Sequence, residues 1–157
     1  MRLLTFFIAL PLLTACGADG PDPVRPTETY PPQALTHETA EVLERDGVLV
    51  EVFERGDGPV LQEGSQARVL YTGWFRNTDR VFDSNAPVGP PYPVTIGAGG
   101  VIPGWQIGLR GLTEGTKARF HIDWEKAYGK RGSPGIPPEA DLVFDIELVP
   151  PPPSVNK

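Results

Sequence analysis

Hydrophobic and polar residues alternate with a period of two along four stretches of the chain, which is typical of β-strands with one buried face. These stretches are residues 48–53, 67–72, 117–124 and 142–148. In the last two, the apolar positions are Ala118, Phe120, Ile122 and Trp124, then Leu142, Phe144, Ile146 and Leu148. Turn residues at 56–59 and 77–79 separate the earlier stretches, and a short return strand is expected at 80–82. The pattern predicts antiparallel strands that bury one face and leave the other in solvent.

A different periodicity, lying between these strands, predicts one short helix. Pro103 suits the first helical position, and Trp105, Leu109 and Leu112 recur at i, i+4 and i+7. Gly111 supplies a stop signal. We therefore predict an α+β domain over residues 47–149, in which an antiparallel sheet wraps around one short helix.

The first residues of the chain have the composition of a targeting signal. Arg2 gives a short positive region, and the apolar run 3–13 is shorter than the roughly 20 residues needed to span a bilayer. Leu13-Thr14-Ala15-Cys16 resembles a bacterial lipobox, which implies that residues 1–15 are a lipoprotein signal peptide and that Cys16 is lipidated. An ordinary cleaved signal that contains a cysteine is the alternative. Gly17 stands where an Asp commonly retains lipoproteins in the inner membrane, so in a two-membrane host the resemblance implies the outer membrane, facing the periplasm.

The segments on either side of the predicted domain are rich in proline. Residues 16–46 are interpreted as the lipidated cysteine and a flexible tether, because 17–35 consist mainly of Pro, Gly and polar residues. The stretch 36–46 fits either one or two helical turns or an extended lead-in, and its periodicity does not decide between them. Residues 150–157 form a Pro-rich tail, interpreted as a disordered end, with a ligand for an aromatic groove as the alternative.

Charge and motif content exclude several classes of function. The 157-residue chain has a net charge of -6 and no basic stripe, so nucleic acid is not an expected partner. His37, His121 and the single cysteine cannot form a metal site of ordinary spacing. The sequence has no nucleophile elbow, phosphate-binding loop, dinucleotide-binding turn or zinc-protease motif. We expect neither a metal nor a cofactor.

Aromatic residues next to turns are the remaining candidates for chemistry, although each of them taken alone fits a core residue better. They are Tyr71, Phe82, Tyr92, Trp105, Tyr128 and Phe144. Most of them fall in six short motifs, which occur in the order Val69-Leu70-Tyr71-Thr72-Gly73, Val81-Phe82-Asp83-Ser84, Val101-Ile102-Pro103-Gly104-Trp105, Ala127-Tyr128-Gly129, Gly135-Ile136-Pro137-Pro138 and Leu142-Val143-Phe144-Asp145. This series closely resembles the FKBP family of peptidyl-prolyl cis-trans isomerases, from about Gly47 to Val149.

The resemblance implies a half-barrel of antiparallel strands curled around the helix, with a substrate pocket between helix and sheet. Trp105 would form the floor, and the walls would be Tyr71, Phe82, Tyr92, Val101, Ile102 and Phe144. The Tyr128 hydroxyl and the Ile102 N–H would donate hydrogen bonds to substrate carbonyls. Asp83 would bond to Tyr71 at the polar edge, and Ile136 would sit on the loop that overhangs the pocket. Catalytic roles are thus expected for Tyr71, Asp83 and Tyr128.

The implied activity is rotation of X-Pro bonds in exported proteins, which assists their folding in the cell envelope. Rotation makes and breaks no covalent bond, so it requires neither nucleophile nor metal. Proline-containing polypeptides are the expected substrates, with macrolides as inhibitors, although Ser133 stands where some family members carry a bulkier residue. The loop 129–141 is too short for an inserted chaperone domain, and we expect a monomer. A non-catalytic module that holds proline-containing segments, or a purely structural lipoprotein, are the alternatives.

Overall fold

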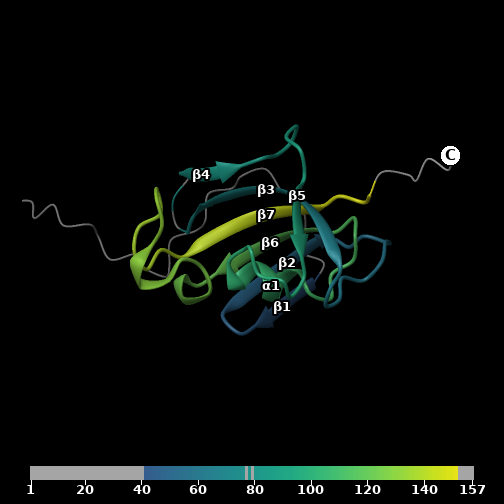
Figure 1. The fold of residues 1–157 in the computed structure, drawn as a ribbon, viewed down its shortest axis with the longest axis horizontal. Helices are drawn as coiled ribbons and strands as arrows, with labels where there is room; N and C mark the ends of the chain where they lie inside the picture. The colour runs from purple at the N-terminus through teal and green to yellow at the C-terminus, as the bar shows by residue number, and fades with distance from the viewer. Residues whose placement is uncertain (1–40, 77, 79, 152–157) are drawn as a thin grey trace, which may run out of the picture.

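The computed structural model describes residues 41–76, 78 and 80–151. In these residues, seven strands form one antiparallel sheet, and one α-helix lies against it (Figure 1). The elements are β1 (Glu41–Arg45), β2 (Val48–Glu54), β3 (Gln66–Phe75), β4 (Val81–Ser84), β5 (Tyr92–Thr95), α1 (Pro103–Leu109), β6 (Lys117–Ile122), η1 (Trp124–Lys126), η2 (Gly129–Arg131) and β7 (Leu142–Leu148), where η marks a 3-10 helix. The predicted α+β class is confirmed. No helix in the described part of the chain is long and apolar enough to cross a bilayer.

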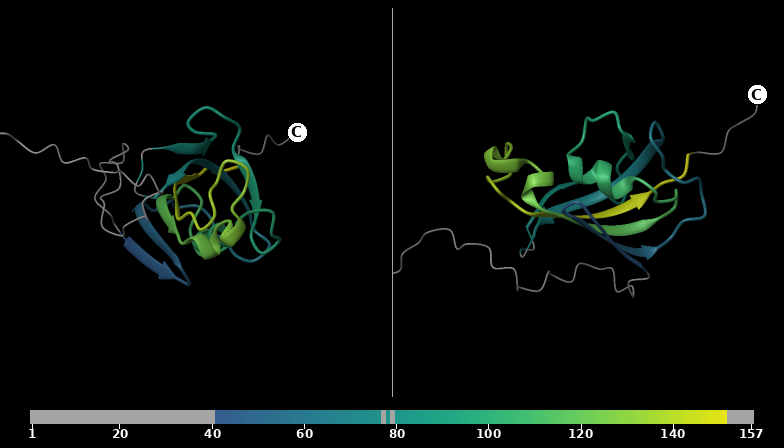
Figure 2. Two further views of the ribbon diagram at one scale, coloured as in Figure 1. Left: turned by 90° about the vertical axis from the view of Figure 1, so that its left-hand side faces the viewer. Right: turned by 90° about the horizontal axis from the view of Figure 1, so that it is seen from below.

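The strand order brings distant segments together on one face of the sheet. The order is β1-β2-β6-β7-β3-β4, and β5 pairs with the first half of β3. Phe120 on β6 lies opposite Val50 on β2 and opposite Phe144 on β7. Side chains alternate between the faces of a strand, so this register places the predicted apolar positions of β2, β6 and β7 on the same side. That side faces α1, as the right-hand view of Figure 2 shows, and together they form the hydrophobic core.

Two glycines let α1 approach the sheet closely. A Cβ atom on Gly104 would lie 2.4 Å from Cγ2 of Ile122, and one on Gly108 would lie 2.5 Å from Cε2 of Phe120. Both neighbours are buried side chains of β6. The helix therefore lies directly on β6, which fixes the height of its buried Trp105 above the sheet.

The helix begins as predicted and ends earlier than the apolar periodicity suggests. Pro103 is its first residue and Leu109 its last, and Gly111 has a positive φ of 81°. Leu112 is fully buried, but it lies beyond the helix and donates its N–H to the carbonyl of Leu109 at 3.1 Å. The apolar spacing of Leu112 therefore reflects burial in the core and not a further helical turn.

The sheet starts upstream of the predicted domain boundary at Gly47. Glu41–Arg45 pairs with β2 as strand β1, so the assignment of residues 41–46 to the tether was wrong. Asp46 and Gly47 both have positive φ, 41° and 77°, as a tight two-residue hairpin requires. Val42 of β1 is 56% exposed, so this edge strand shows little of the apolar alternation that revealed the other strands.

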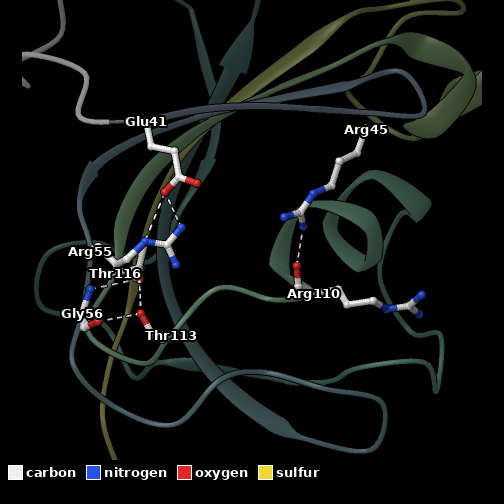
Figure 3. A network of polar contacts seen from close by, with 7 residues as sticks. All are labelled: Glu41, Arg45, Arg55, Gly56, Arg110, Thr113 and Thr116. Atoms are coloured by element: carbon white, nitrogen blue, oxygen red, sulfur yellow. Dashed lines mark hydrogen bonds and ion pairs between the residues drawn. The ribbon is translucent and has the colours of Figure 1, made fainter.

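Side chains of β1 tie this edge strand to the rest of the domain (Figure 3). Glu41 forms an ion pair with Arg55, and the Arg45 guanidinium donates to the backbone carbonyl of Arg110, which caps the C-terminal end of α1. A cation at that end of a helix is electrostatically favourable. The strand is thus attached both to the sheet and to the helix.

Two further expectations differ from the structure. Trp124 was expected to extend the strand 117–124, but β6 ends at Ile122 and Trp124 begins η1. Strand β5 was not predicted, because Pro93 interrupts its short pattern. The predicted signal peptide 1–15, Cys16, the tether as far as residue 40 and the end of the tail (152–157) lie outside the described residues.

Candidate active site

A cavity of about 190 Å³ opens between α1 and the sheet. Its lining consists of Tyr71, Phe82, Asp83, Tyr92, Gly100, Val101, Ile102, Trp105, Tyr128 and Phe144. These are all the residues predicted for the pocket except Ile136, together with Gly100. The structure therefore brings residues from β3, β4, β5, α1 and β7 to one place, as the sequence predicted. We call this space the aromatic cavity.

Edge-to-face contacts hold the indole of Trp105 in place. Its ring lies 5.0 Å from that of Tyr71 and 5.3 Å from that of Phe144, at interplanar angles of 82° and 86°. Tyr92 approaches in the same way at 6.4 Å and 90°. Such T-shaped arrangements are the favoured geometry of aromatic pairs. Trp105 is only 4% exposed, so it can present one rigid apolar surface to a ligand.

A glycine in β3 makes room for two of the aromatic rings that line the cavity. Gly73 lies opposite Phe144 on β7 and opposite Asp83 on β4. A Cβ atom on Gly73 would lie 2.7 Å from the Phe144 ring and 2.8 Å from the Phe82 ring. The two rings, which meet edge to face at 5.6 Å, can therefore close over the strand only because this position has no side chain.

The polar edge of the cavity is a tyrosine–aspartate pair. The Tyr71 hydroxyl donates to Oδ2 of Asp83 at 2.6 Å, which confirms the predicted bond. Burial raises the pKa of the Tyr71 phenol well above its ordinary value, and the hydrogen bond to Asp83 raises it further. The hydroxyl therefore stays protonated and keeps the carboxylate at the rim of the cavity.

Two other donors border the aromatic cavity. Tyr128 is 38% exposed, and none of the described residues accepts a hydrogen bond from its hydroxyl. Burial raises the pKa of this phenol, as does the negative charge of Asp83, so the hydroxyl remains a donor at neutral pH. Ile102 immediately precedes α1, and a backbone N–H at that position has no acceptor within its helix. Both predicted donors are therefore present at the site.

Ile136 does not line the aromatic cavity itself. It lines a second cavity of about 230 Å³, which we call the adjoining cavity. Phe82, Asp83 and Tyr128 line both spaces. Ile136 is only 9% exposed because its side chain joins the hydrophobic core. Ile136 is therefore a wall of the adjoining cavity.

The other candidate spaces lack this combination of groups. A larger groove of about 350 Å³ involves Leu70, Thr72 and Trp74, which alternate along β3 with the core-facing residues and so lie on the opposite face of the sheet. Its charged residues include Lys117 and Asp145, which form ion pairs with neighbouring strands. Within 41–76, 78 and 80–151, no cluster of His, Cys, Asp and Glu has the arrangement of a metal site.

A family model described as FKBP-type peptidyl-prolyl cis-trans isomerase matches residues 58–149, which include every residue of both cavities. The chain belongs to this family. FK506-binding protein 1 of Debaryomyces hansenii is 43% identical over 102 residues, which cover 64% of this chain and 90% of that protein. The FK506-binding protein of Neisseria meningitidis serogroup B is 39% identical over 104 residues, with coverages of 66% and 94%.

Solved FKBP structures share the fold as well as the sequence. The crystal structure of FkpA from Escherichia coli superimposes with a TM-score of 0.60 at 38% identity, over 66% of this chain and 47% of that one. The N-terminal domain of FKBP42 from Arabidopsis thaliana gives a TM-score of 0.65 at 27% identity, over 70% and 91%. The chain thus spans about half of the FkpA chain and nearly all of the FKBP42 domain.

Two side-chain amides that sequence reasoning missed hold the loops around this FKBP-type cavity. Gln106 on α1 accepts from the Gly97 N–H at 2.7 Å and donates to the carbonyls of Thr95 and Gly99, which fixes the loop before Val101. Asn85 accepts from the Tyr71 N–H at 2.7 Å and donates to the Val69 carbonyl. Asn at the end of a strand is a known turn signal, but no pattern pointed to Gln106.

Proposed function

We propose that this chain is an active isomerase of X-Pro bonds in exported polypeptides and that it works as a monomer in the cell envelope. The observation that carries the proposal is the aromatic cavity itself. A rigid indole surface, the Tyr71–Asp83 pair and an available Tyr128 hydroxyl surround a space open to a polypeptide. All of these groups come from one chain, so a second copy is not needed to complete the site.

The geometry suits a reaction that is only a rotation. Amide resonance produces the barrier of about 18–20 kcal/mol, and uncatalysed exchange takes tens to hundreds of seconds. A planar amide is more polar than a twisted one, so water-poor aromatic walls around Trp105 favour the twisted state relative to the planar one. Donors at Tyr128 and Ile102 would hold the substrate carbonyls while the proline ring rests on the indole. Each tenfold gain in rate needs only about 1.4 kcal/mol, so several modest contacts suffice.

A peptide isomerisation assay on residues 17–157, together with a proline-limited refolding assay, tests the activity. The parent protein should accelerate both reactions, and a macrolide that enters the aromatic cavity should compete with the peptide. A folded protein whose rate equals that of buffer would contradict the proposal. Peptide binding without acceleration would instead identify a non-catalytic module.

Tyr128→Phe should lower kcat/KM for the peptide about 3- to 10-fold, because it removes one hydrogen bond to substrate. Sedimentation of the parent protein should give the mass of one chain.

We propose further that Cys16 carries the lipid that attaches the enzyme to a membrane, which is the outer membrane in a host with two. The support is the sequence around Cys16, with Gly17 following it. Mass spectrometry of the mature protein should find an N-terminal lipidated cysteine, and Cys16→Ala should release the protein from the membrane fraction. An unmodified cysteine would leave the ordinary cleaved signal as the explanation of residues 1–15.

A further inference from the structure

Two strands pair with the same edge of β3, and a gap separates them. Strand β4 ends at Ser84, which lies opposite Thr72 of β3. Strand β5 begins at Tyr92, which lies opposite Val69. Tyr71 of β3 falls between these two pairs. Backbone N–H and C=O groups at such a place need hydrogen-bond partners, so another part of the molecule has to supply them for Tyr71.

The carboxamide of Asn85 fills this gap in the way that a strand would. Its Oδ1 accepts from the Tyr71 N–H at 2.7 Å, and its Nδ2 donates to the Val69 carbonyl at 3.0 Å. The backbone N–H of Asn85 donates to the Tyr71 carbonyl at 3.1 Å. A side-chain amide carries an acceptor oxygen next to a donor nitrogen, as a peptide group does. Both backbone groups of Tyr71 on this edge are therefore bonded to Asn85.

The same side chain also closes the loop that leads to β5. Nδ2 of Asn85 donates to the Pro90 carbonyl at 3.1 Å, and the Gly89 N–H donates to the Asn85 carbonyl at 2.8 Å. A Cβ atom on Gly89 would lie 2.4 Å from that carbonyl oxygen, so the closed loop requires a glycine there. Asn85 thus joins the end of β4, which carries Asp83, to the start of β5, where Tyr92 lines the aromatic cavity.

These bonds bear directly on the polar edge of the aromatic cavity. The Tyr71 hydroxyl donates to Asp83 at 2.6 Å, and Asp83 precedes Asn85 by two residues. We propose that Asn85 is a positioning residue of the isomerase, which holds the Tyr71–Asp83 pair in the geometry that turnover requires; the inference rests on the proposed function. Asn85 does not line the aromatic cavity itself, so it acts through the pair.

Substitutions of Asn85 in the full chain, assayed in mild detergent with an X-Pro peptide, test this role. Asn85→Ala should lower kcat/KM per folded molecule about 5- to 10-fold, because small displacements of site groups are costly. Asn85→Asp should lower it at least as much, since a carboxylate cannot donate and would face the carbonyl oxygens of Val69 and Pro90. Asn85→Ser retains one hydroxyl and should fall between the parent and Asn85→Ala.

Thr72→Val is the matched control for a loss of stability alone. The hydroxyls of Thr72 and Ser84 lie 2.9 Å apart and form a neighbouring link between β3 and β4. Thr72 lies on the face of the sheet opposite the aromatic cavity and does not line it. Its substitution should lower the urea midpoint, as Asn85→Ala does, while activity per folded molecule stays at the parent value.

A double variant shows whether Asn85 acts through the tyrosine–aspartate pair. Tyr71→Phe removes the hydroxyl that bonds to Asp83. If Asn85 positions that bond, Asn85→Ala should lower kcat/KM less than about 2-fold in the Tyr71→Phe background, because residues of one network are not additive. The full loss in both backgrounds would overturn the positioning role.

Failure of this inference can be distinguished from failure of the proposed function. If the parent is active and Asn85→Ala matches it per folded molecule, the positioning role is overturned and the isomerase function stands. If Asn85→Ala does not fold, Asn85→Ser is judged against the parent on the same terms. Absence of turnover by the folded parent would overturn the isomerase function, and the positioning role with it.

Discussion

Replacing Trp105 with alanine is expected to reduce kcat/KM for peptide isomerisation by at least about 100-fold and to destabilise the fold. The indole is 4% exposed and contacts the rings of Tyr71 and Phe144. Removing a buried aromatic side chain typically costs about 3–5 kcal/mol. The substitution also removes the surface on which the proline ring would rest, and with it several contacts at once. Each tenfold loss of rate corresponds to about 1.4 kcal/mol. Urea denaturation and a peptide isomerisation assay measure the two effects.

Leu109→Ala separates catalysis from stability in this experiment. Leu109 lies on the same helix and is fully buried, but it lines neither cavity. Its truncation should lower the free energy of unfolding by about 2–5 kcal/mol, which is comparable to the effect of Trp105→Ala. Activity per folded molecule should stay near that of the parent. Trp105→Phe should keep most of the activity because it preserves an aromatic floor. Equal activity per folded molecule in Trp105→Ala and Leu109→Ala would show that the indole is only a core residue.

Gly108→Ala is expected to lower both stability and activity, although alanine is the better helix former. The added methyl would lie 2.5 Å from the fully buried ring of Phe120. Overpacking of this kind costs about 1–3 kcal/mol, which outweighs a gain in helix propensity of at most about 1 kcal/mol. The helix must rise from β6, and Trp105 moves with it. Denaturation midpoints and kcat/KM should therefore fall together.

Phe120→Leu provides the compensating partner for that variant. A smaller side chain at position 120 opens space under Gly108, so the double variant Gly108→Ala, Phe120→Leu should lose less stability than the sum of the single changes. The coupling should be about 1 kcal/mol, as for residues in direct contact. Strict additivity of the two changes would mean that the close approach of α1 to β6 is not what excludes a side chain at position 108.

Burial on one face explains which parts of the fold were readable from sequence. Strand β6 alternates strictly between buried and half-buried residues, and β7 alternates between buried and more exposed residues after Val143, because both strands lie in the middle of the sheet with one face on the core. Edge strands lack that constraint. In β1, Val42 is exposed, and only the Asp46-Gly47 hairpin signal was available to reveal the strand. In β5, Pro93 interrupts a four-residue strand whose pairing depends on β3.

The members of the site were predictable, but their spacing was not. The family resemblance implied the bond between Tyr71 and Asp83, and the pairing of β3 with β4 brings the two side chains together. The division of the space into two cavities depends on how the turn 133–136 folds back, which placed Ile136 in the core. No pattern in the sequence identified Gly73 and Gly108 as functional positions, because the aromatic rings that approach them belong to other strands.

The attachment of β1 determines how mechanical load would reach the site. A pull on the chain at Glu41 acts first on its pairing with Val52 and its ion pair with Arg55. The contact with α1 is made by Arg45, at the opposite end of the same strand. The ladder between these two points would have to peel apart residue by residue before any displacement reached the helix that carries Trp105. Strand β1 would therefore keep a pulling force on the preceding chain from displacing the helix that carries Trp105.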